Sequence, residues 1–111
     1  MSTKLPIDSN NNPIQALRLK SGAAHKITTS GTSARNTTAF GANTSVISVY
    51  ATQDVYLNFG DSSVTATGTD HFFPAGVYYD IALGADGTAH ATHLAALQVT
   101  SGGTVYISEK E

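Results

Sequence analysis

The sequence contains no cysteine and no tryptophan. The lack of cysteine excludes disulfide bonds and thiolate metal sites, and it leaves the redox compartment undetermined. Charged residues make up only 13% of the 111 residues, well below the usual quarter. Because 41% of the residues are hydrophobic, the sparse charge does not indicate disorder. We therefore expect one folded domain with a neutral surface rich in hydroxyl groups.

Long apolar runs are also missing. No run approaches the roughly 18 residues that span a bilayer. The first twelve residues, MSTKLPIDSNNN, lack the hydrophobic segment of a signal peptide. We therefore expect no membrane partner, and a protein that either stays in the cytosol or leaves the cell without the secretory route.

Most sequence patterns of catalysis are absent as well. Glutamate does not occur before Glu109, and there is no Gly-rich phosphate loop, no G-x-S-x-G elbow and no H-E-x-x-H motif. The basic residues are spread along the chain without interleaved aromatic residues, a poor pattern for binding nucleic acid. The sequence therefore predicts a protein that is not an enzyme, has no cofactor and binds no nucleic acid.

Two groups of residues could hold a metal ion. His90 and His93 have helical spacing, but positions three apart in a strand face opposite sides, and we interpret both as surface imidazoles. Asp61 and Asp70 bracket the polar loop of residues 60–70, yet this loop lacks the closely spaced carboxylates of calcium sites. No metal site is predicted at either place.

Seven of the nine aromatic residues lie between residues 46 and 83. This stretch contains three short apolar segments, at 46–51, 55–59 and 77–83, each β-branched or aromatic in character and typical of strands. The first segment is apolar on both faces, as expected for a strand that is covered on both sides or lies at an interface. The residues expected on the apolar face of the third are Val77, Tyr79, Ile81 and Leu83.

Further strands are predicted on both sides of this stretch. Residues 14–19 form the first candidate, which Ser21 and Gly22 would end, and residues 24–30 suggest an edge strand or a largely solvated one. Residues 94–99 are expected to be a strand, although 89–96 have some helix propensity. Altogether about eight short strands at intervals of roughly ten residues predict an all-β fold, either an antiparallel β-sandwich or a jelly roll.

The two ends of the chain have different expected structures. Residues 1–13 contain Pro6, three consecutive asparagines and Pro13, and they are expected to be an extended arm before a β-sandwich domain of residues 14–111. Residues 101–103 predict a hairpin turn into a last strand at 104–108. The final three residues are expected to be solvated.

Charge and tyrosine placement each allow two interpretations. Residues 1–35 carry five basic residues against one acid, a net +4, while residues 36–111 carry seven acids against one lysine, a net −6. This polarity would steer a basic arm onto an acidic neighbour, or it is chance scatter in a weakly charged chain. The outward tyrosines expected at positions 56, 78 and 106 either fit a pleated surface or mark an interface.

Several motifs occur in an order that is found in a known group of proteins. YLNFGDSS, FFPAGVYYDIAL and LAALQVTSGGTVYISE contain, in turn, an FG strand end, a PAG turn and a closing strand that ends in Ser108-Glu109. Over roughly residues 24–109 the chain resembles small virion proteins of tailed phages. It is most similar to the head decoration, or cementing, proteins of short-tailed phages of the epsilon-fifteen kind.

The resemblance implies a jelly-roll-like fold and a place on the outer surface of the capsid, after synthesis in the cytoplasm of the bacterial host. The implied partner is the major capsid protein, whose subunits the protein would bridge and stabilise in the expanded head, and a homodimer or homotrimer is expected there. It implies no catalytic residues. The candidate contact residues are Lys4, Leu5, Pro6, Ile7, Arg35, Phe40, Tyr56, Asp61, Tyr78 and Tyr106.

Two other functions stay open at this point. One is a different virion part, such as the base of a head fibre or a β-module associated with the tail. The other is a non-viral β-sandwich that binds sugar or calcium.

Overall fold

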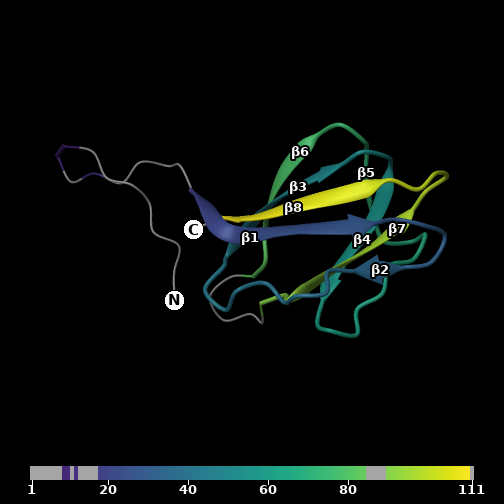
Figure 1. Ribbon diagram of the computed structural model, residues 1–111, viewed down its shortest axis with the longest axis horizontal. Coiled ribbons are helices and arrows are strands. Elements are labelled where there is room, and N and C mark those ends of the chain that lie inside the picture. The colour runs from purple at the N-terminus through teal and green to yellow at the C-terminus, as the bar shows by residue number, and fades with distance from the viewer. Residues whose placement is uncertain (1–8, 11, 13–17, 85–89, 111) are drawn as a thin grey trace.

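The protein is a sandwich of two four-stranded antiparallel sheets, seen in a computed structural model that describes residues 9–10, 12, 18–84 and 90–110 (Figure 1). None of these residues forms a helix, so the predicted all-β sandwich is confirmed. The predicted arm, residues 1–13, lies almost entirely outside the described residues. The first sheet contains β1 (Leu19–Thr28), β8 (Thr104–Lys110), β3 (Val46–Ala51) and β6 (Tyr78–Ala82), in that order. The second contains β2 (Ala34–Arg35), β7 (His93–Gln98), β4 (Val55–Gly60) and β5 (His71–Phe73), in that order.

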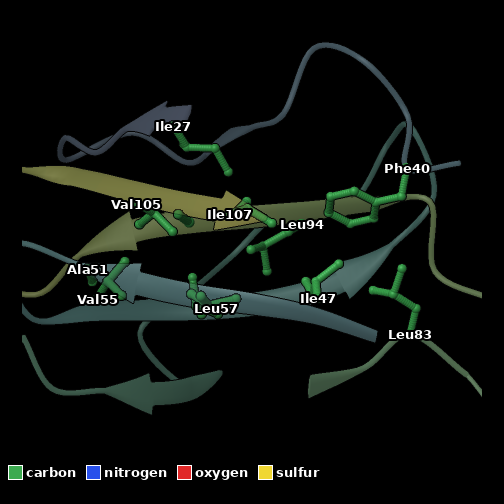
Figure 2. Close-up of a cluster of buried hydrophobic side chains, with 12 residues drawn as sticks. Ile27, Phe40, Ile47, Ala51, Val55, Leu57, Leu83, Leu94, Val105 and Ile107 are labelled. Atoms are coloured by element: carbon green, nitrogen blue, oxygen red, sulfur yellow. The ribbon is translucent and has the colours of Figure 1, made fainter. Parts of the chain in front are cut away.

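The core lies between the two sheets and is filled by alternate residues of the strands, as the period of two requires. On β3, Ile47 and Val49 are buried against the second sheet, while Tyr50 faces outward and is half-buried. Figure 2 shows how side chains from both sheets meet in one cluster. The buried cluster is Ile27, Phe40, Ile47, Val49, Ala51, Val55, Leu57, Leu83, Leu94, Ala96, Val105 and Ile107.

Strand β1 differs from its prediction. It lies at the edge of its sheet, as expected for residues 24–30, but it begins at Leu19 and continues through Ser21 and Gly22. The register with β8 shifts between Leu19 and Ala24, and Gly22 has a φ of 73°. Glycine adopts this left-handed conformation without steric cost, so the chain forms a bulge where a strand end was predicted. Of the strand predicted at 14–19, residues 14–17 lie outside the described residues, and Leu19 faces solvent.

The turn at residues 74–76 is confirmed as a turn, but the strand after it begins one residue later and ends one residue earlier than predicted. Gly76 has a φ of 80°, and its N–H donates to the Ala51 carbonyl at 2.9 Å. The Ala75 N–H donates to the Asp54 carboxylate at 2.8 Å. These two bonds hold Val77 in the turn, where it is 42% exposed, so its predicted place on the apolar face is wrong. Tyr79 and Ile81 are half-buried and Leu83 is buried, as expected.

The turn before the last strand is not a hairpin, which corrects the prediction for residues 101–103. Strand β7 pairs with β2 and β4, whereas β8 pairs with β1 and β3. The chain therefore crosses from one sheet to the other at this turn. A Gly-rich turn permits both outcomes, and the pairing partners of the flanking strands decide between them.

Candidate functional site

The most heavily bonded polar group in the described part of the chain is the Glu109 carboxylate. It is 3% exposed and lies at the end of β8, on the same face as Val105 and Ile107. One oxygen, Oε1, accepts hydrogen bonds from the Thr44 hydroxyl at 2.5 Å and the Gly41 N–H at 2.9 Å. The other, Oε2, lies 2.6 Å from His25 Nε2. The predicted solvated end is therefore wrong at Glu109, because strand alternation turns this residue inward.

These contacts set the charge of Glu109. Burial alone would raise the pKa of its carboxyl, since the ionised form loses hydration. The hydrogen bonds from Thr44, His25 and Gly41 outweigh burial, and the pKa lies below its ordinary value. Lys20 Nζ adds a weaker charge interaction at 3.9 Å, from a side chain that is one-third exposed. The cluster joins β1, β8 and the chain before β3, so its role is to fix one end of the sandwich.

Phe40 belongs to the same end of the molecule, and its prediction as a contact residue is wrong. Its side chain is buried in the core cluster (Figure 2). Its ring meets the His25 ring edge-on at a centroid distance of 5.1 Å. Phe40 is the only large apolar residue in the polar connection of residues 28–43. The hydrophobic effect therefore places it inside, where it anchors this connection.

The candidates Arg35 and Asp61 are both exposed, and both are engaged in local contacts on the second sheet. Arg35 donates to the Val64 carbonyl at 3.0 Å, and Asn58 donates to the Thr65 carbonyl at 3.0 Å. The Asp61 carboxylate accepts from both the N–H and the hydroxyl of Ser63, which lowers its pKa. The polar loop of residues 60–70 is thus tied to the second sheet.

Histidines 90 and 93 have different surroundings. His90 is exposed, as predicted, but His93 is buried and its Nδ1 lies 2.9 Å from the Thr92 hydroxyl. Residue 93 opens β7, where pairing with Gly60 brings it into the sheet. No group of three or more histidine, aspartate or glutamate side chains among the described residues could hold a metal ion.

Tyr56 lies on the outer face of the second sheet in a row of apolar residues. The register pairs Tyr56 with Phe72 on one side and with Leu97 on the other. Its ring meets that of Phe72 edge-on at 6.1 Å, and Phe72 is 52% exposed. We call Phe72, Tyr56 and Leu97 the apolar row.

Tyr78 and Tyr106 lie on the outer face of the first sheet, as predicted, and are exposed. The register pairs each of them with Tyr50 on the intervening strand β3. The rings of Tyr50 and Tyr78 are 5.0 Å apart, and Lys26 Nζ lies 5.9 Å from the centre of the Tyr106 ring. We call Tyr106, Tyr50 and Tyr78 the tyrosine ladder.

The remaining contact candidates, Lys4, Leu5, Pro6 and Ile7, lie outside the described residues. Sequence reasoning missed Tyr50 as the link of the ladder and Glu109 as a buried group. The alternation of Val105, Ile107 and Glu109 carried the signal for the second, since all three share one face. The sequence signal for Tyr50 was weaker, because only strand pairing brings the three tyrosines into one row.

Comparisons of the chain with protein families, curated proteins and solved structures found no match. In the part of the chain that the structure describes, no helix is long and apolar enough to cross a membrane.

Proposed function

We propose that the protein is a structural component of a phage virion, which binds the outer surface of the expanded head and bridges subunits of the major capsid protein. It acts by adhesion, not by catalysis. This function was first suggested by the resemblance of its sequence motifs to those of head decoration proteins. The observation that carries it furthest is the order of the strands, because this order supports the jelly-roll fold expected of such proteins.

The strand pairs are nested along the chain. Strand β1 pairs with β8, β2 with β7, β3 with β6, and β4 with β5. A long hairpin with these four pairs gives a jelly roll when it is wound into a sandwich, and the further pairs β3·β8 and β4·β7 arise from the winding. Jelly rolls of eight strands occur in viral capsid proteins and in lectins. The topology therefore supports a virion protein, and it is shared with sugar-binding proteins.

The apolar row is the surface that we assign to the capsid. Phe72, Tyr56 and Leu97 lie side by side on three strands and carry no charge. Aromatic residues of this kind are enriched at protein interfaces. The row begins at Phe72 on the edge strand β5, which is only three residues long. A rigid sandwich that binds several subunits through such small contacts gains its strength from multiple attachment.

Co-sedimentation with shells tests this function. The chain is mixed with expanded heads, and separately with unexpanded shells, of the phage that encodes it. We expect it to pellet with expanded heads at hundreds of copies per particle, and Phe72→Ala to weaken binding about tenfold or more, as loss of an anchor residue does. Tyr78→Ala, on the opposite sheet, is the matched control and should bind as the wild type does.

Failure of the wild-type chain to bind expanded heads would contradict the proposal. The copy number distinguishes head decoration from the other virion functions, since a dozen or fewer copies per particle would indicate a fibre base or a tail component. Analytical ultracentrifugation of the free protein tests the expected dimer or trimer.

A further inference from the structure

The outer face of the first sheet contains a hollow of about 330 Å³ beside the tyrosine ladder. Its volume is at the lower end of the range of small-molecule sites. The hollow is lined by Leu19, Ser48, Tyr78, Asp80, Ser108 and Lys110. We propose that this hollow and the ladder bind a neutral oligosaccharide, with one pyranose ring stacked on Tyr78.

The floor of the hollow is made of two hydroxyl groups. Ser48 and Ser108 face each other across β3 and β8, and Asp80 pairs with Ser48 from β6. Ser48 is only 4% exposed, yet no hydrogen bond joins its hydroxyl to any residue that the structure describes. A buried hydroxyl without a partner is unfavourable, and a ligand that bears hydroxyl groups satisfies it.

One wall of the hollow is a charged pair. Lys110 Nζ lies 2.8 Å from the Asp80 carboxylate, and the two residues reach toward each other from the strands on either side of β3. The ammonium donates hydrogen bonds and the carboxylate accepts them, so the pair can bind a hydroxyl group both as an acceptor and as a donor. Because the two charges offset each other, the hollow attracts neither anions nor cations strongly. This charge balance favours a neutral ligand.

Another part of the lining is aromatic. Tyr78 is 71% exposed, and its ring presents an apolar surface that matches the C–H face of a pyranose. Strands lie about 4.8 Å apart, so the ladder from Tyr78 through Tyr50 to Tyr106 extends for about 10 Å across the sheet. This length corresponds to two or three sugar units. The ladder thus continues the platform that begins in the hollow.

Two other occupants fit the hollow less well. A peptide that binds by strand addition needs a free sheet edge, but the hollow lies over β8 and β3, which are paired on both sides. A second copy of the chain, packed face to face, would bury the pair of Lys110 and Asp80 and lose its hydration. A sugar leaves this pair partly hydrated and adds hydrogen bonds to it.

Titration of the full chain with sugars tests the proposal. The probes are maltotriose, cellotriose, mannotriose and tri-N-acetylchitotriose, followed by saturation-transfer NMR and calorimetry. We expect at least one of them to bind with a Kd on the order of 1 mM, as suits an open hollow. Tyr78→Ala should weaken that binding about tenfold through loss of the stacked ring. Ser48→Ala should weaken it a few-fold, and Phe72→Ala, on the other sheet, should leave it unchanged.

Tyr78→Ala and Ser48→Ala should both keep the backbone NMR spectrum of the folded chain. A lost saturation-transfer signal then reports a loss of sugar binding and not unfolding. The proposal is wrong if no probe binds with a Kd below roughly 20 mM, a limit that is about twentyfold weaker than the expected Kd. It is also wrong if binding persists undiminished in Tyr78→Ala and Ser48→Ala, since the sugar would then lie elsewhere. If Tyr78→Ala instead abolishes attachment to expanded heads or dissociates an oligomer, the face is a protein interface, and the sugar site is excluded.

Discussion

At the scale of single residues, Glu109 shows how an ion can be buried and still contribute to stability. Its carboxylate receives a hydroxyl, a backbone N–H and an imidazole within 2.9 Å. Hydrogen bonds to an ionised group are stronger than neutral ones, and they replace the water that burial removes. The carboxylate therefore holds the chain before β3 against the last strand.

The lowered pKa of Glu109 predicts a loss of stability in acid. Its folded-state pKa lies below that of the unfolded chain, about 4.3, so the unfolded state takes up protons first as the pH falls. The contribution is complete above the unfolded pKa and is lost as the pH falls through the folded one. Glu109→Gln should cost about 1–3 kcal/mol at pH 7, because the charge-assisted hydrogen bonds are lost.

Urea unfolding at pH 7, 5, 4 and 3 measures this effect. The difference between wild type and Glu109→Gln should be constant above pH 5 and should shrink below pH 4. Asp80→Asn, which alters an exposed ion pair, is the control and should cost well under 1 kcal/mol at every pH. A difference that does not change with pH would contradict the assignment.

At the scale of elements, strand positions could be predicted from the sequence, but the connections between strands could not. Alternation located β4 and β8, and the β-branched, apolar character of residues 46–51 located β3. The turn at residues 101–103 looked like a hairpin, because turn chemistry is local while sheet membership depends on distant partners. Strand β2 has two residues and β5 has three, too few for any periodicity to be read.

The turn before β6 offers a direct test of a local requirement. Gly76 has a φ of 80°, and a Cβ placed there would meet no atom within 4 Å, so Gly76→Ala would introduce backbone strain alone. We expect a loss of about 1–2 kcal/mol in the free energy of unfolding, the cost of a left-handed alanine. Equilibrium unfolding in urea measures it.

Gly68→Ala is the matched control for this variant. A Cβ there also meets nothing within 4 Å, and the backbone is not left-handed. Alanine should leave the stability unchanged or raise it by a few tenths of a kcal/mol, because it restricts the unfolded chain. Equal effects of the two substitutions would rule out strain at Gly76.

At the scale of the whole molecule, the fold depends on its last strand. Strand β8 lies between β1 and β3 and supplies the buried Val105 and Ile107 as well as Glu109. Figure 1 shows the last strand, in yellow, running beside the first, in blue. Without β8 the first sheet would separate into β1 alone and the pair of β3 and β6.

Removal of residues 104–111 should therefore abolish cooperative folding. The truncated chain loses two ladders of hydrogen bonds and the burial of two aliphatic side chains worth about 1.5–3 kcal/mol each, a large part of the stability of a domain this size. Circular dichroism and thermal melting should show no folding transition, while a chain that lacks only Glu111 should melt as the full chain does. A truncated chain that still melts cooperatively would show that the remaining strands form a domain by themselves.

The pairing of the first strand with the last has a consequence for synthesis in the cell. Strand β1 needs a partner that the ribosome makes after strands β2 to β7, so the sandwich closes only after β8 has emerged. Prematurely terminated products lack that partner and stay unfolded, open to proteases. Each molecule that reaches its binding site as a folded domain has therefore been translated through to β8.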